Sequence, residues 1–333
     1  GTPEGAFAPA DPSPFLEQGP STPVALVYRS GRPYVEAVVL GPSGRRRGLM
    51  LLDTGWTQPA LTTRTAQAIG LTGDASSGSL TQDAAGRTVA MDAATLPRLE
   101  VADGAWVDLP VKLVDWSDDQ LLGVLGNRLF EGQVLEIRAS EDTVHWRSSP
   151  SEPTGHPAPY CASPQIQASI AGRQGLFVLD TGAFIDIVYA ATDEERDELA
   201  RQSGGGEHRA LGVVSGGAGA RSLGPADIAL GGHRLSNATG AVLTRSGGPR
   251  RGLIGWSTLR CFDSTLDFGN ERASFDLVGA PDRCAVYEGP APTLEEQVFT
   301  AVCFGIFCVL PVVAFPLLLV RRRRLQRVYD GEI

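Results

Sequence analysis

Two copies of the triplet Asp-Thr-Gly, each at the end of a similar apolar run, constrain the fold of this chain more than any other feature. The first copy ends residues 48–55 and the second ends residues 175–182. A single triplet is a weak signal, because Asp and Gly favour turns for local reasons. Two copies behind matching runs indicate a duplicated lobe, with one carboxylate from each copy meeting at a pseudo-twofold axis. Paired carboxylates in one site supply an acid and a base from one residue type.

The repeat extends beyond the triplets, as a gene duplication should leave it. Asp53 and Asp180 are 127 residues apart, and the glycines of two later apolar-apolar-Gly motifs, Gly126 and Gly255, are 129 residues apart. Matched elements are expected around them in the same order: helices over 62–69 and 193–202, short helices over 127–130 and 256–259, and strands over 133–138 and 264–268. Nearly constant spacing of four features indicates two copies of one lobe.

An Asp-Thr-Gly that ends an apolar strand, followed by a hairpin and an apolar-apolar-Gly, resembles a lobe of the aspartic peptidases of the retropepsin and pepsin kind. Residues 253–275 resemble the end of a pepsin lobe closely, and the whole resemblance covers about residues 24–280. It implies an all-β, bilobal, pepsin-like architecture of two duplicated retropepsin-like β-barrel lobes. Because both lobes lie in one chain, it also implies a monomer.

The resemblance assigns roles to eight residues. Asp53 and Asp180 form the catalytic dyad, in which one carboxyl holds a proton while the other accepts one from a water. A threonine of each triplet hydrogen-bonds to the opposite lobe, the triplet glycine permits close backbone approach, and a later glycine lets the next helix pack beneath the loop. These supporting residues are Thr54 and Thr181, Gly55 and Gly182, and Gly126 and Gly255.

Two positions after the triplets depart from the pepsin pattern, in which Ser or Thr stands there. Ala183 is retropepsin-like and removes a hydrogen bond to the charged carboxylate, so we expect a higher pKa for the dyad than in pepsin and an optimum at mildly acidic to neutral pH. Trp56 is large for its position. It either fills part of the cleft and narrows specificity, or marks a lobe that has lost activity.

Hairpins that close over a substrate are the remaining element of the family. Lobe one offers residues 80–91, with the turn near 83–86, and lobe two offers residues 211–223. Neither segment carries the tyrosine of pepsin flaps, and each could equally be an ordinary surface hairpin.

The sequence divides into seven segments. An uncharged run begins at Val298 and ends at Val320, just long enough for a transmembrane helix, and four arginines follow at once. By the positive-inside tendency the C-terminus is cytoplasmic and the lobes are periplasmic or extracellular. The segments are a Pro-rich leader (1–22), lobe one (23–146), a linker (147–160), lobe two (161–286), a stalk (287–297), the transmembrane helix (298–320) and a basic tail (321–333).

Cysteines and charge bound the remaining possibilities. The part outside the membrane segment holds Cys161, Cys261 and Cys284; Cys261 could pair with Cys284, Cys161 could pair with Cys284, or all three could be free. A net charge of −9 argues against nucleic acid as a partner. The four histidines lack metal-ligand spacing, so we expect neither a metal nor a cofactor.

These observations predict a membrane-anchored, single-chain aspartic endopeptidase that acts on protein or peptide substrates. Two alternatives remain open. One is a catalytically inactive retropepsin-like module that binds peptides or a partner at the membrane surface, favoured by Trp56. The other is a membrane sensor, although the tail after Arg327 is short for an output domain. Retention of both triplets favours the enzyme, since an inactive site needs neither carboxylate.

Overall fold

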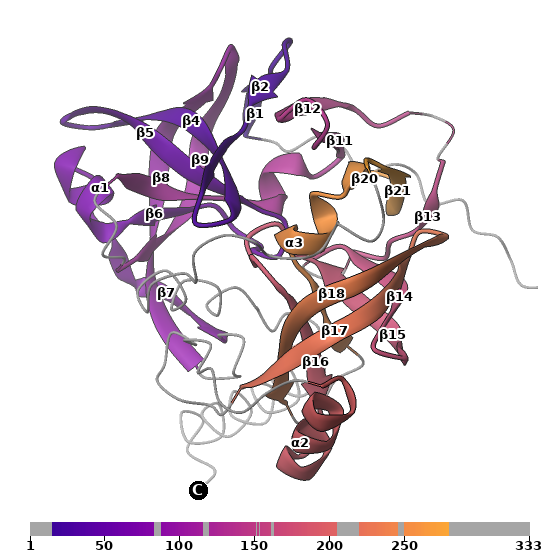
Figure 1. Cartoon of the computed structure of the whole chain (residues 1–333). Helices are drawn as coiled ribbons and strands as arrows, with labels where there is room; N and C mark the ends of the chain where they lie inside the picture. The colour runs from indigo at the N-terminus through magenta and orange to yellow at the C-terminus, as the bar shows by residue number, and fades with distance from the viewer. Residues whose placement is uncertain are drawn as a thin grey trace, which may run out of the picture.

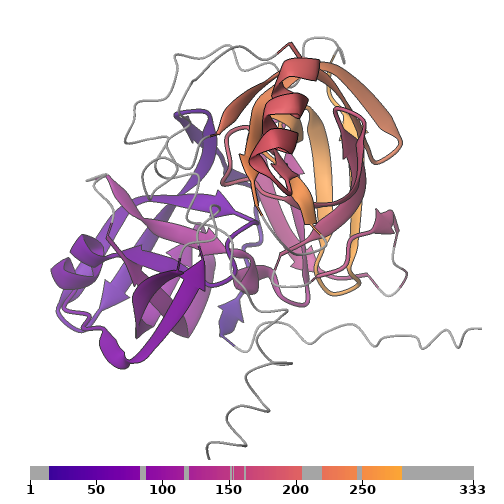
Figure 2. The ribbon, with the colours of Figure 1, turned by 90° about the horizontal axis from the view of Figure 1, so that it is seen from below.

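The computed structural model describes residues 15–82, 88–115, 120–150, 152, 154–160, 163–204, 220–245 and 250–279. Strands make up most of these residues and the helices are short, so the all-β prediction is confirmed. Two lobes lie side by side, one built from the indigo to magenta part of the chain and the other from the rose to orange part (Figures 1 and 2).

The first lobe contains a closed barrel of six strands, because β8 pairs with both β9 and β4 and thereby joins the ends of the sheet. Around the barrel the order is β4 (Arg32–Gly41), β5 (Gly44–Asp53), β10 (Leu121–Gly126), β6 (Ala60–Thr62), β9 (Gly104–Val114) and β8 (Thr88–Val101). Three further strands extend this sheet: β1 (Leu16–Gln18) on β9, β3 (Val27–Arg29) on β4 and β7 (Asp74–Gln82) on β8.

The second lobe is a closed barrel of the same kind. Its order is β14 (Gln165–Ile170), β15 (Arg173–Leu179), β19 (Arg250–Ile254), β16 (Asp186–Ala190), β18 (His233–Thr244) and β17 (Arg221–Leu230). In both barrels the second and third strands are parallel, the fourth and fifth are parallel, and the other pairs are antiparallel. The duplication read from the sequence is therefore confirmed strand by strand.

A six-stranded sheet joins the lobes. Its order is β13 (His156–Pro157), β21 (Arg272–Leu277), β20 (Phe262–Asp267), β11 (Gln133–Arg138), β12 (Thr143–Ser148) and β2 (Val24–Ala25). At its centre β11 pairs antiparallel with β20, where Glu136 lies opposite Thr265. The pseudo-twofold axis passes between these two strands, so a half-turn relates one half of the sheet to the other.

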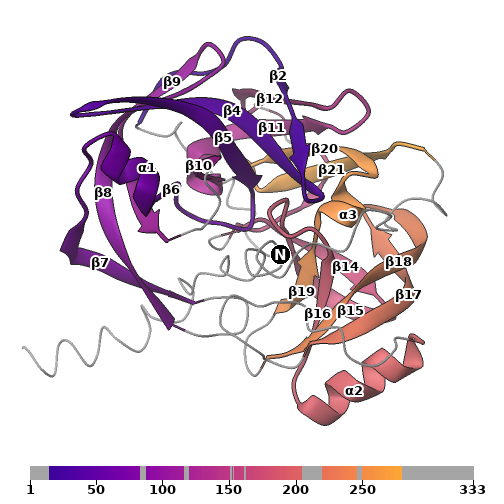
Figure 3. The same cartoon turned by 60° about the vertical axis from the view of Figure 1, so that its left-hand side comes forward.

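The helices lie where the sequence predicts them. Helix α1 (Thr63–Ala68) follows β6 and α2 (Asp193–Gln202) follows β16, and each packs on its own barrel (Figure 3). Both begin behind a threonine whose side chain accepts a hydrogen bond from a backbone N–H of the first turn, Thr62 from Thr65 and Thr192 from Glu195. The short helices η1 (Asn127–Phe130) and α3 (Trp256–Leu259) also match their predicted bounds.

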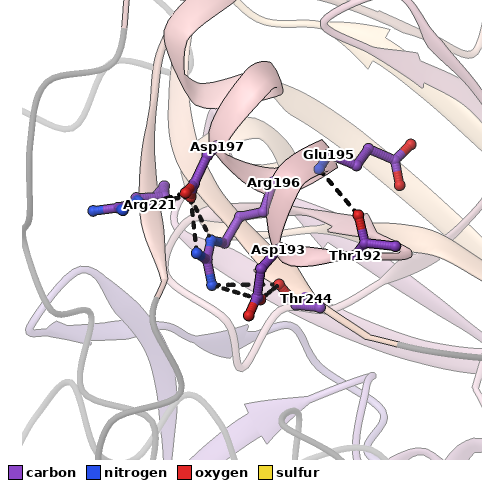
Figure 4. A network of polar contacts seen from close by, with 7 residues as sticks. All are labelled: Thr192, Asp193, Glu195, Arg196, Asp197, Arg221 and Thr244. Atoms are coloured by element: carbon purple, nitrogen blue, oxygen red, sulfur yellow. Dashed lines mark hydrogen bonds and ion pairs between the residues drawn. The ribbon is translucent and has the colours of Figure 1, made fainter.

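A network of polar contacts fixes helix α2 to the second barrel (Figure 4). Arg196 forms ion pairs with Asp193 and Asp197 of the helix, and Asp197 also pairs with Arg221 at the start of β17. These two guanidinium groups lower the pKa of Asp197 to about 2. The Asp193 carboxylate accepts a hydrogen bond from Thr244, the last residue of β18. Side chains of α2 therefore hold the first residue of β17 and the last residue of β18.

Several predicted segments lie outside the described residues. They are most of the leader, the second candidate flap up to residue 219, the stalk, the membrane span from Val298 to Val320 and the basic tail. Within the described ranges no helix is long and apolar enough to cross a bilayer. Cys161 and Cys284 are also outside these ranges, so the three pairing possibilities stay as predicted, while Cys261 is buried beside α3.

Candidate active site

The two aspartates meet where the barrels touch. Asp53 ends β5 and Asp180 directly follows β15, and neither side chain has exposed surface. A Cβ atom placed on Gly55 would lie 2.4 Å from Asp180 Cγ, and one on Gly182 would lie 2.1 Å from Asp53 Oδ2. The glycine of each triplet thus lies directly against the carboxyl of the other lobe, and a side chain there would displace it.

The triplet threonines exchange hydrogen bonds across the interface. Thr54 Oγ1 accepts from Thr181 N at 3.1 Å and donates to Leu179 O at 2.7 Å. In the reverse direction, Thr181 Oγ1 accepts from Thr54 N at 3.0 Å and donates to Leu52 O at 2.6 Å. All four bonds are buried, so each hydroxyl satisfies two backbone groups of the opposite lobe that water does not reach. These four bonds therefore hold the two loops to each other across the interface.

Backbone amides support one oxygen of each carboxyl. Asp53 Oδ1 accepts from Trp56 N at 2.9 Å, and Asp180 Oδ1 accepts from Gly182 N and Ala183 N, both at 3.0 Å. Hydrogen bonds of this kind favour the ionised carboxylate. The backbone of Trp56 serves its aspartate in the way that the backbone of Ala183 serves the other, so the large side chain of Trp56 leaves this contact intact.

The two carboxyls interact strongly as titrating groups. Burial raises the pKa of Asp180 well above its ordinary value, the negative charge of Asp53 raises it further, and the amides of Ala183 and Gly182 oppose the rise. Two carboxyls in this position cannot both ionise at the pH where a solvated aspartate does. The pair therefore retains one proton into a pH range that suits general acid–base chemistry.

Gly126 and Gly255 bring a short helix beneath each loop. A Cβ on Gly126 would lie 2.6 Å from the backbone of Gln58, and a Cβ on Gly255 would lie 2.2 Å from Ile185 O. The next residues donate backbone hydrogen bonds into the loops, Asn127 N to Trp56 O at 2.8 Å and Trp256 N to Ala183 O at 2.6 Å. The structure thus places all six predicted supporting residues around the two aspartates.

Lobe one has a support that the sequence analysis missed. Asn127 Nδ2 donates to Thr54 O at 3.0 Å, and Asn127 Oδ1 accepts from the Tyr160 hydroxyl at 2.5 Å. Asn127 is fully buried. Its place directly after Gly126 was the available signal, whereas the contact with Tyr160, 33 residues away in the interlobe connection, could be found only in the fold.

Lobe two has a different support, also missed. Asp186 Oδ1 accepts from Gly255 N at 2.8 Å, and Oδ2 accepts from the Thr258 hydroxyl at 2.7 Å. Burial raises the pKa of Asp186 to about 7, against the effect of these hydrogen bonds. The carboxyl fixes the start of α3 beneath the Asp180 loop. A lone aspartate at the start of an apolar strand gave little reason to single it out.

Apolar side chains from both lobes surround the dyad. Trp56 is 5% exposed, and on the lobe-two side Phe184 and Ile185, which follow Ala183, are buried in the same cluster. Arg32 of lobe one lies over the Phe184 ring, 5.8 Å from its centroid. The cluster consists of Tyr34, Leu51, Trp56, Ala60, Met91, Val114, Leu121, Val124, Val178, Ala183, Phe184, Ile185, Ile187, Tyr189, Ala220, Ala241, Leu243 and Leu253. Such surroundings strengthen electrostatic interactions at the aspartates.

The first candidate flap is a hairpin, as predicted. Strands β7 and β8 pair antiparallel from Asp74 opposite Ala93 to Gln82 opposite Thr88, and residues 83–87 lie outside the described ranges. Met91 of β8 packs in the same apolar cluster as Trp56. Strand β8 of this hairpin therefore reaches the apolar cluster beside the site. Among the described residues no group of His, Cys, Asp and Glu side chains is arranged to hold a metal ion.

Comparison with known proteins agrees with this geometry over lobe one. A family model described as aspartyl protease matches residues 35–129, which run from β4 into η1 and include Asp53 and Gly126. A search of curated proteins found no match. The matched segment and the two closed six-stranded barrels together fit a two-lobed aspartic protease.

Proposed function

We propose that this chain is an aspartic endopeptidase in which Asp53 and Asp180 activate a water for attack on a peptide bond. The observation that carries the proposal is the reciprocal contact of the triplets. Each glycine lies against the opposite carboxyl, and each threonine is bonded to the opposite backbone. A dyad assembled from two lobes requires such an exchange, because neither barrel alone holds both carboxyls.

The shared proton supplies the chemistry. The ionised carboxylate of the pair takes a proton from the water as its oxygen bonds to the scissile carbonyl carbon, and the protonated carboxyl gives its proton to the carbonyl oxygen. The tetrahedral intermediate then collapses as the C–N bond breaks. The carboxyl that took the proton of the water gives it to the leaving nitrogen, and the other carboxylate takes a proton from a hydroxyl of the intermediate, which restores the shared proton. The raised pKa of Asp180 keeps the acid form available, so we expect an optimum at mildly acidic to neutral pH.

We also propose that the residues from Val298 to Val320 anchor the lobes to a membrane with the site outside the cytoplasm. The support is the uncharged run followed by four arginines. The full chain should sediment with membranes after carbonate washing, whereas a chain that ends at residue 297 should not. Full release of both would overturn the anchor without touching the peptidase proposal.

Peptide-library cleavage tests the peptidase proposal. The full chain in detergent should cleave a diverse library between pH 3 and 8, and pepstatin, a transition-state mimic for this class, should inhibit it. Asp53→Asn and Asp180→Asn should each reduce kcat by at least about 10³-fold, because each removes one member of the acid–base pair. Cleavage that survives either substitution would contradict a shared dyad. A folded chain without cleavage at any pH would favour the inactive binding module.

A further inference from the structure

In lobe two, a tyrosine and an arginine lie in contact near the dyad, and the peptidase mechanism does not use them. Tyr189 lies on β16 in the apolar cluster around the aspartates and is 5% exposed. The Arg245 guanidinium lies over its ring, 5.0 Å from the centroid. Arg250 is at the start of β19, and burial and the charge of Arg245 lower its pKa. These three residues are called the Tyr189–Arg245 group below.

Two buried polar atoms of this group have no acceptor for their hydrogens among the described residues. They are the Tyr189 hydroxyl and Arg245 Nη1. Burial is the main influence that raises the pKa of Tyr189; the positive charge of Arg245 and a hydrogen bond from its side chain act against the rise, and the charge of Asp180 adds to it. The charges of Arg245 and of Asp180 therefore both act on the Tyr189 hydroxyl. A buried donor without a partner costs free energy of folding, so its presence beside a site calls for a ligand.

No carboxylate of the described residues neutralises Arg245. The acidic side chains that helix α2 brings to this side of the barrel are engaged elsewhere, as Figure 4 shows for Asp193 with Arg196 and Thr244, and for Asp197 with Arg196 and Arg221. Thr244, directly before Arg245, is bonded to Asp193, and Arg245 N donates to Ala190 O at 2.8 Å. The backbone that presents Arg245 is therefore fixed, and no acidic side chain in the described ranges pairs with its guanidinium.

We propose that the Tyr189–Arg245 group is a specificity subsite that binds an acidic side chain of the substrate. A guanidinium can donate two parallel hydrogen bonds to a carboxylate, and the tyrosine hydroxyl can donate a third. A substrate carboxylate would satisfy both buried donors at once, whereas an amide or an apolar side chain would leave at least one unsatisfied. Discrimination of this kind is strong because the penalty falls on the wrong ligand.

The inference rests on the proposed peptidase function. A measurement of peptide binding, made without cleavage, can distinguish failure of the subsite from failure of the peptidase. The full chain carrying Asp53→Asn is titrated with C-terminally amidated decapeptide pools, each fixed as Glu or Gln at one position. At one position the Glu pool should bind about tenfold more tightly than the Gln pool. Arg245→Met should bring this ratio close to one, and Tyr189→Phe should reduce it about threefold. Arg234→Met is the matched control, because Arg234 lies on the same lobe with 77% of its side chain exposed.

The outcomes are distinct. Cleavage by the native chain with no preference for Glu at any position would overturn the subsite and leave the peptidase proposal standing. Binding selective for Glu without cleavage would support the subsite and overturn the peptidase. A Glu-to-Gln ratio that is unchanged in Arg245→Met would also overturn the subsite. If that variant does not fold, Arg245→Lys, which keeps the charge but cannot make paired bonds, should lower the ratio, and an unchanged ratio would count against the proposal.

Discussion

The two lobes present their aspartates with the same backbone but support them with different side chains. In lobe one, Asn127 ties the short helix to the carbonyl of Thr54 and to Tyr160. In lobe two, Asp186 ties the short helix through Gly255 N and the Thr258 hydroxyl. The residue six positions after the first aspartate is Pro59, where lobe two has Asp186. Both lobes therefore hold the backbone of the aspartate loop in the same geometry, and they do so with different side chains.

This comparison separates two kinds of residue. The residues of the two triplets are identical in both copies, because each must satisfy the same contact across the axis. Those that brace a loop from behind differ, because any side chain that satisfies the same buried backbone groups will do. Substitutions at paired positions should accordingly have equal effects, and substitutions at the bracing positions unequal ones.

The largest effect is expected at the triplet glycines. Gly55→Ala and Gly182→Ala should each abolish cleavage, because the new Cβ would lie 2.4 Å from Asp180 Cγ or 2.2 Å from Asp53 Cγ. Equal loss of kcat in peptide cleavage would support the symmetry. Gly44→Ala, at a hairpin glycine with no atom within 4 Å of the new Cβ, should behave as the native chain. Full activity in either triplet variant would contradict the close approach.

The triplet threonines should show the next largest effect. Thr54→Val and Thr181→Val each leave a buried N–H and a buried carbonyl of the other lobe unsatisfied. Each should lower the free energy of unfolding by about 4 kcal/mol, measured by urea denaturation. Thr54→Ser and Thr181→Ser keep the hydroxyl and should recover most of the loss. A large difference between the two valine variants would break the proposed equivalence.

Asp186 should make lobe two sensitive to pH. Its folded pKa of about 7 is above the ordinary value, so the stability is fully present below about pH 4 and is lost as pH rises through 7. Asp186→Asn should remove this loss, which we expect to be about 3 kcal/mol. Urea denaturation at pH 4, 5.5 and 7 measures it, with Asp227→Asn at an exposed position as the control. Parallel pH profiles of native chain and Asp186→Asn would refute the assignment.

Asn127 should show the smallest effect and no comparable pH dependence. Asn127→Leu removes the hydrogen bonds to Thr54 O and to Tyr160 and should cost about 2 kcal/mol of unfolding free energy. Tyr160→Phe removes only one of the two and should cost about half as much. If the two variants were equally destabilised, the bond to Thr54 O would contribute nothing.

The features that both lobes repeat could be predicted from the sequence, whereas the side-chain pairs present in only one lobe could not. The triplets, the later glycines and the short helices carry their own local signals, so their positions and bounds could be predicted from the sequence. Asn127 with Tyr160, Asp186 with Thr258, and Tyr189 with Arg245 are brought together only by the folding of the chain. Each pair joins strands or loops far apart in the chain, and nothing in the spacing of one partner indicates the other.

Trp56 shows the limit of reasoning from a family pattern. Its size suggested either a side chain that fills part of the cleft and narrows specificity or a lobe that has lost activity. In the structure its backbone N–H donates to Asp53 Oδ1 as that of Ala183 donates to Asp180 Oδ1. Its side chain packs in the apolar cluster with Met91 and Phe184. A side chain that fills the site cannot be told from one that packs in the surrounding wall by sequence alone, because the difference depends on where neighbouring strands of both lobes run.

The most direct test of the central claim, that carboxyls from two lobes form one titrating pair, is a carbon-13 NMR titration of the aspartate carboxyls. In the native chain Asp180 should titrate well above its ordinary pKa, because of burial and the charge of Asp53. In Asp53→Asn the pKa of Asp180 should fall, yet remain raised by burial. An Asp180 titration that is identical in the native chain and in Asp53→Asn would contradict the account, because the two carboxyls would then be independent.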